Sequence, residues 1–107
     1  MAKLEKTLNE SFDSILHRVD GAVMKSISAS LEDSCDWHIG DARCSVRVYE
    51  RYSYAGGNRV SMNVTIFQNG NGPVKLCAIT SGGSQAMFFK INTWGEESFL
   101  EALEKEL

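Results

Sequence analysis

A thiol and an imidazole stand three residues apart in the segment Cys35-Asp36-Trp37-His38. A cysteine nucleophile needs a base within hydrogen-bonding distance and a third group that orients the base. A neighbouring aspartate could supply that group, and a long irregular segment is a common place for a site. The alternative is an acidic, solvated loop whose tryptophan folds onto the edge of the core, and we prefer it because nothing nearby enforces the geometry. Cys35, Trp37 and His38 are therefore loop candidates only, and no catalytic residue is assigned.

The cysteines Cys35, Cys44 and Cys77 contain no CxxC pair. Together with a histidine they could supply the tetrahedral ligands of a zinc ion. Their spacing matches no zinc-ribbon or zinc-finger pattern, and a free cysteine on a strand usually behaves as a small apolar residue. The glycine-rich residues 81–84 lack the lysine of a phosphate-binding loop and indicate a hairpin turn instead. We therefore predict no metal site and no cofactor.

Basic and acidic residues occupy different parts of the chain. The stretch 42–92 carries six lysines and arginines against a single glutamate, whereas 1–41 and 93–107 are acidic. Three arginines alternate with apolar residues on one expected strand, and the next expected strand adds an aromatic residue at its polar positions. If all of them share one exposed sheet face, guanidinium groups would lie beside aromatic rings, as on sheets that contact phosphates and stack bases. The candidate ligand-binding residues are Arg43, Arg47, Tyr49, Arg51 and Phe67.

Other interpretations of the same charge pattern stay open. A solvated sheet face also needs polar residues, and arginine or lysine there deters pairing between sheet edges. A basic sheet could instead bind the acidic helices of another subunit, since complementary charges steer partners together. The net charge of −3 and the sequence pI of about 5.3 argue against broad nucleic-acid binding, for which basic domains are expected.

The elements that must position these residues follow from the hydrophobic pattern. A helical stripe runs from Leu4 to Val23, and the stop signal Asp20-Gly21 places the end of the predicted helix, which covers residues 3–20. Alternation of period two predicts four strands, and a stretch that is apolar on both sides, as in a central strand, predicts a fifth over residues 75–80. These strands cover residues 26–31, 43–49, 60–67, 75–80 and 87–91.

Most links between these strands are short and glycine-rich, which favours antiparallel neighbours because a parallel crossover needs a dozen or more residues. The exception is the longer connection over residues 32–41. A capping box from Thr93 to Glu96 predicts a second helix from about Trp94 to the end. The expected fold is therefore α+β, an antiparallel meander sheet of about five strands with N-terminal and C-terminal helices packed on one face.

The size and composition of the chain fit one folded domain over residues 1–107. It has 107 residues, of which 43% are hydrophobic, and a single proline. Charges recur every two or three residues at the N-terminus, and no stretch approaches the ~18 apolar residues of a membrane span. We expect no signal peptide and no membrane segment. An odd set of cysteines fits a reducing compartment, so we expect a cytoplasmic protein.

Two stretches carry a resemblance to a known family. They are Val46–Tyr52, continuing through Asn58–Ser61, and Ala78–Gln85 together with Trp94–Phe99. They resemble an uncharacterised family of small bacterial cytoplasmic proteins, a domain of unknown function of about this length. The resemblance covers most of residues 22–107 and implies a bacterial source and a stand-alone domain. It implies no site residues, because no activity is established for the family.

The sequence favours a non-catalytic binding or interaction domain that forms a homo-oligomer, with a dimer favoured. One alternative is a sheet that binds an anionic small molecule or single-stranded nucleic acid. Another is an enzyme that uses the loop from Cys35 to His38.

Overall fold

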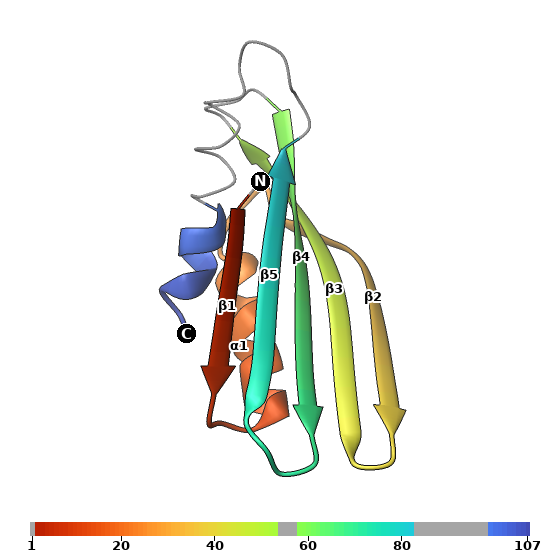
Figure 1. Ribbon diagram of the computed structural model, residues 1–107. Helices are drawn as coiled ribbons and strands as arrows, with labels where there is room; N and C mark the ends of the chain where they lie inside the picture. Colours follow the sequence, from red (N-terminus) through yellow and green to blue (C-terminus); the bar gives the residue numbers. More distant parts are fainter. Residues whose placement is uncertain (1, 54–57, 83–98) are drawn as a thin grey trace.

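The computed structural model describes residues 2–53, 58–82 and 99–107. In chain order they form β1 (Ala2–Leu8), α1 (Phe12–Val23), β2 (Ser30–Ile39), β3 (Ala42–Ser53), β4 (Asn58–Asn69) and β5 (Val74–Gly82). Residues 99–104 are helical and end the described chain as a short C-terminal helix. Figure 1 shows these elements and the position of both termini.

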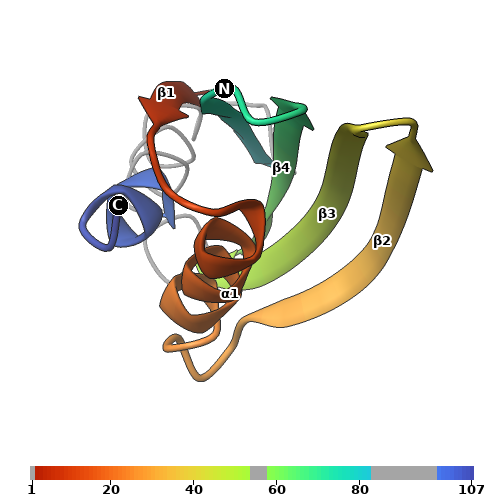
Figure 2. The same cartoon turned by 90° about the horizontal axis from the view of Figure 1, so that it is seen from below.

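The strands form one antiparallel five-stranded sheet in the order β1-β5-β4-β3-β2. Strands β2 to β5 follow one another as a meander, and β1 pairs with β5, with Ala2 opposite Thr80 and Leu8 opposite Val74. The edges of the sheet are therefore β1 and β2, and α1 crosses from one edge to the other. Figure 2 shows α1 and the C-terminal helix on the same concave side of the curved sheet. The predicted α+β class, antiparallel sheet and placement of both helices on one face are confirmed.

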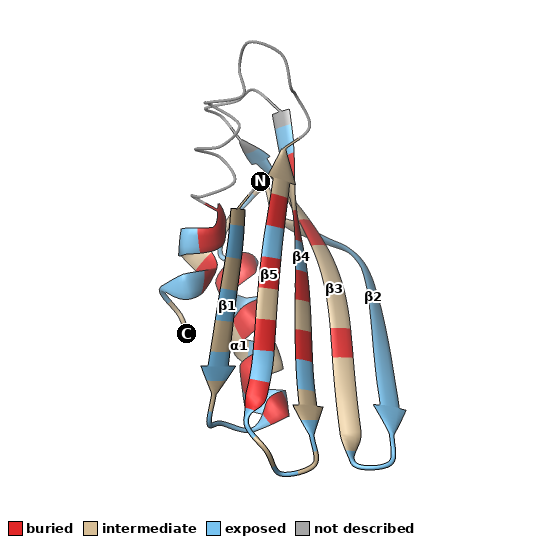
Figure 3. Cartoon of the chain, viewed as in Figure 1, coloured by how far each residue is buried: buried red, intermediate tan, exposed pale blue. Residues whose placement is uncertain are grey.

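The core lies between the concave face of the sheet and the two helices. β5 alternates buried and more exposed residues along its length, as expected for a strand with one face in the core. Figure 3 shows buried positions on α1, β4 and β5, whereas β2 is exposed along almost its whole length. The buried apolar residues are Phe12, Ile15, Val19, Ala22, Val23, Tyr49, Val60, Met62, Val64, Ile66, Val74, Leu76, Ala78, Phe99, Leu100 and Leu103.

The predicted helix over residues 3–20 is wrong at its start. Residues 2–8 alternate between half-buried and exposed positions as strand β1. Leu4 and Leu8 are four residues apart, a spacing that suits both a helical stripe and one face of a strand. The helix begins after Ser11, whose Oγ accepts a hydrogen bond from the backbone N–H of Ser14 at 3.1 Å.

The helix also continues past its predicted end at Asp20-Gly21. Ala22 and Val23 extend its buried face, and the backbone N–H of Met24 donates to the carbonyl of Asp20 at 3.0 Å. Burial of two more apolar residues outweighs the roughly 1 kcal/mol by which a glycine disfavours a helix interior.

The predicted strand over residues 26–31 and the predicted loop over 32–41 are both replaced by β2, which begins at Ser30 and ends at Ile39. An edge strand that is exposed on both faces needs no apolar alternation, so its polar residues looked like a loop. A tight turn at Gly40 leads to β3, and the φ of 57° at Gly40 is a left-handed conformation that glycine adopts without strain.

The remaining predicted strands over 43–49, 60–67 and 75–80 lie within β3, β4 and β5, each of which is longer than expected. The predicted strand over 87–91 lies outside the described residues, as do residues 94–98 of the predicted second helix. In the part of that helix that the structure describes, residues 99–104 are helical. Within the described ranges, no helix combines the length and apolar composition needed to cross a membrane.

Candidate functional site

The arginines of β3 face the helices. Arg47 pairs across the sheet with Val64, and Arg51 pairs with Val60. Cross-strand partners lie on the same face of a sheet, and both valines are fully buried. The prediction that Arg43, Arg47 and Arg51 point away from the packed interior is therefore wrong.

Two of these arginines stack on aromatic rings from the helices. The Arg43 guanidinium carbon lies 4.1 Å from the centre of the Phe12 ring, and its Nη2 donates to Asp13 Oδ1 at 3.0 Å. The Arg51 guanidinium carbon lies 4.5 Å from the centre of the Phe99 ring, where burial lowers the pKa of Arg51. These cation–π contacts tie both helices to β3.

The third arginine belongs to a hydrogen-bonded network. Arg47 donates through Nε to the Tyr49 hydroxyl at 2.9 Å and through Nη2 to Asp20 Oδ1 at 3.3 Å. The Tyr49 hydroxyl donates to the same Asp20 oxygen at 3.1 Å. Burial, opposed by the nearby Arg47 charge, raises the pKa of Tyr49 to about 12. The network joins the C-terminal half of α1 to the sheet.

The placement of the arginines was predicted wrongly because arginine is amphipathic. Its aliphatic stem packs beside apolar residues while its charged end reaches an acidic partner, and α1 supplies Asp13 and Asp20 for this purpose. Phe67 lies on the opposite face, where it pairs with Cys44. The five candidate residues therefore do not share a surface, and ligand binding by them stays a prediction.

The Cys–His candidate is not assembled either. Its predicted loop is strand β2, and register places Cys35 on the side of the sheet away from the helices and His38 on the helix side. Cys44, next to Cys35 on β3, has a raised thiol pKa, caused first by burial and then by the charges of Cys35 and Asp36. An activated cysteine needs the opposite shift. Among the described residues, no group of three or more His, Cys, Asp or Glu side chains could hold a metal ion.

One hollow does bring predicted residues together. It has a volume of about 350 Å³ between α1 and the β2–β3 hairpin and is lined by Phe12, Asp36, Trp37, His38, Arg43 and Cys44. His38 and Arg43 are cross-strand neighbours there. Asp13 and Asp36 offset the charge of Arg43, so the hollow has no strong preference for an anion.

The side of the sheet away from the helices, called the open face below, carries ordered rows of side chains. Register aligns each row across all strands from β1 to β2. One row holds Lys3, Ile79, Asn63, Val48 and Asp33. The next holds Glu5, Cys77, Thr65, Val46 and Cys35. The one beyond holds Thr7, Lys75, Phe67, Cys44 and Trp37.

Large apolar side chains are exposed at the β2–β4 part of the open face. Trp37 is 58% exposed, Ile39 78% and Phe67 42%. Together with Ala42, Cys44 and Arg43 they line a hollow of about 250 Å³. We call the five residues other than Arg43 the apolar patch. Contiguous exposed apolar groups of this kind mark interaction sites.

The sequence reasoning assigned Trp37 to a loop and missed Ile39. The signal was present in the alternation of Cys35, Trp37 and Ile39, which is strand spacing with the apolar residues on one side. Because the opposite positions on β2 are polar or charged, the pattern was hidden within an acidic segment.

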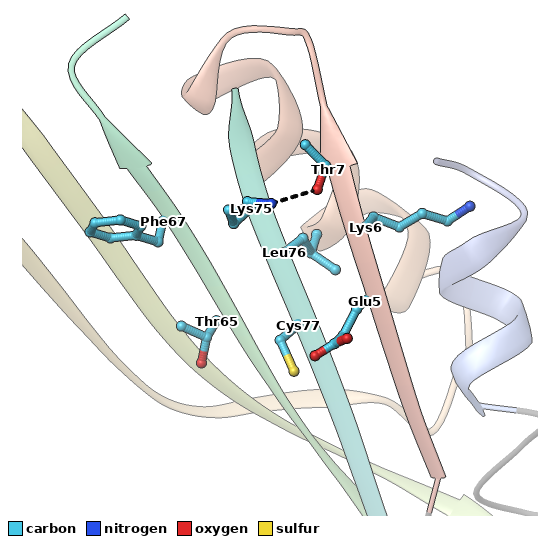
Figure 4. Close-up of a pocket in the computed structure, with 8 residues that line it drawn as sticks. All are labelled: Glu5, Lys6, Thr7, Thr65, Phe67, Lys75, Leu76 and Cys77. Carbon is cyan, nitrogen blue, oxygen red and sulfur yellow. Dashed lines mark hydrogen bonds between the residues drawn. The ribbon is translucent and has the colours of Figure 1, made fainter. Parts of the chain in front are cut away.

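A second hollow on the open face lies over β1, β5 and β4. Figure 4 shows Phe67 at one side of it and Glu5 at the other. Lys75 Nζ donates to Thr7 Oγ1 at 3.0 Å across its floor. Its volume is about 310 Å³, and it is lined by Glu5, Lys6, Thr7, Thr65, Phe67, Lys75, Leu76 and Cys77. On the open face, the charged residues Lys3, Glu5 and Lys75 thus lie on β1 and β5, whereas the apolar patch lies on β2, β3 and β4.

The whole chain matches one family model, the family of unknown function DUF6054, over residues 1–107. The chain belongs to this family. The resemblance to an uncharacterised family of small proteins is thereby confirmed. No curated protein and no solved structure matches the chain. Membership of DUF6054 gives no residue a role, so the function must be inferred from the surface itself.

Proposed function

We propose that this DUF6054 protein is a non-catalytic interaction domain that binds a second copy of itself through the open face of its sheet. The observation that carries the proposal is the exposure of Trp37, Ile39 and Phe67 together on that face. Aromatic residues are enriched at the centres of protein interfaces because they bury much area at little cost in conformational entropy. The free cysteines suit a reducing compartment, so the cytoplasm is the proposed location.

The arginines favour self-association over the anion-binding alternative. Arg43 and Arg47 are ion-paired with Asp13 and Asp20 of the same chain. An incoming phosphate or carboxylate would have to displace these aspartates. On the open face, basic Lys3 and Lys75 are interspersed with acidic groups, which suits a protein surface better than a polyanion.

Sedimentation equilibrium over a range of protein concentrations tests the proposal. The wild-type chain is expected to form dimers, and Phe67→Glu is expected to be monomeric because it places a charge in the centre of the buried face. Ile27→Glu is the matched control. Ile27 is a fully exposed apolar residue between α1 and β2, away from the open face, so its variant is expected to dimerise normally. A wild-type chain that stays monomeric at the highest soluble concentration would refute the proposal.

A further inference from the structure

Two copies that pack open face to open face can be related by different twofold axes. Sheets in sandwiches usually pack with their strands nearly aligned, and a symmetric dimer uses the same surface on both subunits. For full overlap of the faces, this leaves an axis that runs along the strands and one that runs across them. The register of the sheet predicts different residue pairs for each arrangement.

An axis along the strands coincides with β4, the central strand. It reverses every row, so that β1 of one copy lies over β2 of the other, β5 lies over β3, and β4 lies over itself. An axis across the strands keeps each strand over its own counterpart and exchanges the rows. It then coincides with the row that contains Glu5 and Cys77.

The charges of the edge strands favour the axis along the strands. In that arrangement Lys3 on β1 lies opposite Asp33 on β2 of the other copy, twice per dimer. Glu5 lies opposite the neutral Cys35 and has Lys3 of its own chain as ion-pair partner, with Lys3 Nζ 3.8 Å from Glu5 Oε1. With the axis across the strands, Glu5 would face its own counterpart, and Asp33 would face Trp37. Like charges that are buried opposite each other oppose association, and an unpaired carboxylate against an indole is also unfavourable.

Most apolar side chains of the three rows favour the same axis. With the axis along the strands, Ile79 lies opposite Val48, Cys77 lies opposite Val46, and the two Phe67 rings meet at the axis. In the same arrangement Trp37 lies opposite Thr7, and Cys44 lies opposite Lys75. With the axis across the strands, Ile79 would lie opposite Lys75 and Phe67 would lie opposite a polar amide. Apolar side chains gain from burial only where their partners also give up water.

We infer that two copies pair through their open faces about a twofold axis that runs along β4, with Lys3 of each opposite Asp33 of the other. This inference rests on the proposed self-association and adds its geometry. The face is about 24 Å wide across the five strands and about 24 Å long over the seven residues of β1. Its projected area of roughly 600 Å² corresponds to a larger accessible area, close to the ~800 Å² that each partner buries in a standard interface.

Cross-linking at Asn63 tests the axis. Asn63 is an exposed residue of β4 on the open face, so its two copies lie opposite each other only if the axis runs along that strand. We would place Asn63→Cys in a chain whose three native cysteines are serine and treat it with a short bismaleimide, which suits sheets about 10 Å apart. The expected result is a covalent dimer. Thr7→Cys in the same background is the control, because the two copies of β1 would lie on opposite sides of the dimer, roughly 20 Å apart.

The wild-type cysteines give an independent measurement that needs no altered background. An axis across the strands would bring the two Cys77 side chains, and the two Cys35 side chains, opposite each other. We expect the same reagent to produce no Cys77–Cys77 product in the wild-type dimer, as judged by peptide mapping. A dimer that joins through Cys77, or one that does not join through Asn63→Cys, overturns the axis without overturning self-association. A chain that never dimerises overturns both.

Charge reversal checks the edge contact. Lys3→Glu and Asp33→Lys are each expected to weaken the dimer about tenfold, because each change affects two symmetric contacts. The double variant is expected to restore most of the affinity by exchanging the charges. If the double variant loses as much dimer affinity as the two single variants combined, Lys3 and Asp33 are not opposite each other.

Discussion

Each arginine of β3 depends on a group that a helix supplies. Arg43 has the Phe12 ring and Asp13, and Arg47 has Asp20 together with Tyr49 from its own strand. The partners on the helix, Phe12, Asp13 and Asp20, are far away in the sequence. A pattern of alternating charges therefore cannot show which face of the strand is buried. Neutralised in this way, an arginine can occupy a core-facing position that its residue type would not suggest.

Removing the shared acceptor of the Arg47 network should destabilise the fold. Asp20→Ala leaves Arg47, whose side chain is only 15% exposed, and the buried Tyr49 hydroxyl without their common partner. We expect a loss of about 1–3 kcal/mol in the free energy of unfolding, measured by denaturant titration. Asp13→Ala is the matched control on the same helix. Asp13 is 78% exposed, and an exposed ion pair contributes at most about 1 kcal/mol. Equal losses in the two variants would contradict the role of the network.

The raised pKa of Tyr49 predicts a loss of stability in alkali. The ordinary pKa of a tyrosine is 10.0, and burial raises the pKa of Tyr49 to about 12 in the folded chain. Below pH 10 the hydroxyl is protonated in both states. Between pH 10 and 12 only the unfolded chain releases this proton, so the free energy of unfolding falls as the pH rises. Tyr49→Phe should remove this part of the pH dependence while lowering stability at neutral pH. If the free energy of unfolding of Tyr49→Phe falls between pH 10 and 12 as steeply as that of the wild-type chain, Tyr49 is not the source of this pH dependence.

At the scale of elements, the sequence was most informative where one face of a strand or helix is buried. The alternation of β4, the apolar run of β5 and the helical stripe of α1 were visible because burial restricts which positions are apolar. β1 was mistaken for helix since its two leucines fit either period, and β2 was mistaken for a loop since neither of its faces is buried. The candidate site was hard to predict for the same reason. Trp37 and Ile39 lie on the edge strand β2, where no buried face imposes a regular apolar pattern.

Two glycines in different elements predict stability changes of opposite sign. Gly21 lies inside α1, and a Cβ there would contact nothing within 4 Å. Gly21→Ala should therefore stabilise the fold by about 0.5–1 kcal/mol, since alanine loses less entropy on forming a helix. Gly40 also has free space around it but has a φ of 57°. Gly40→Ala should destabilise by about 1 kcal/mol because a Cβ strains this conformation. Thermal unfolding of both variants measures the two stability changes. Changes of the same sign would contradict the left-handed conformation of Gly40 in the β2–β3 turn.

At the scale of the whole molecule, the sheet is covered on one side and open on the other. The arginines of β3, which were predicted to form a binding surface, lie on the covered side. The apolar patch lies on the open side. Long-range register decides this division. The pairing of Arg47 with Val64, like that of Arg51 with Val60, shows which set of β3 side chains faces the core. This pairing cannot be obtained from the local pattern of either strand.

Burial of the open face between two copies predicts a thermal midpoint that depends on concentration. Association adds free energy to the folded state only when the partner is present. The Tm of the wild-type chain should rise with protein concentration, whereas the Tm of Phe67→Glu should stay constant over the same range. Differential scanning fluorimetry or calorimetry is suited to this comparison. A wild-type Tm that does not change with dilution would speak against burial of this face.

The pairing of β1 with β5 has a consequence for how the chain acquires its fold. The Thr80 hydroxyl donates to the carbonyl of Ala2, 78 positions earlier, whereas β2 to β5 pair with sequence neighbours. Contacts that close so long a loop form late, because the chain entropy must be lost before they contribute. During synthesis on a ribosome, β1 emerges long before β5, with which it pairs, has been translated. We therefore expect β1 to join the sheet after β2 to β5 have paired.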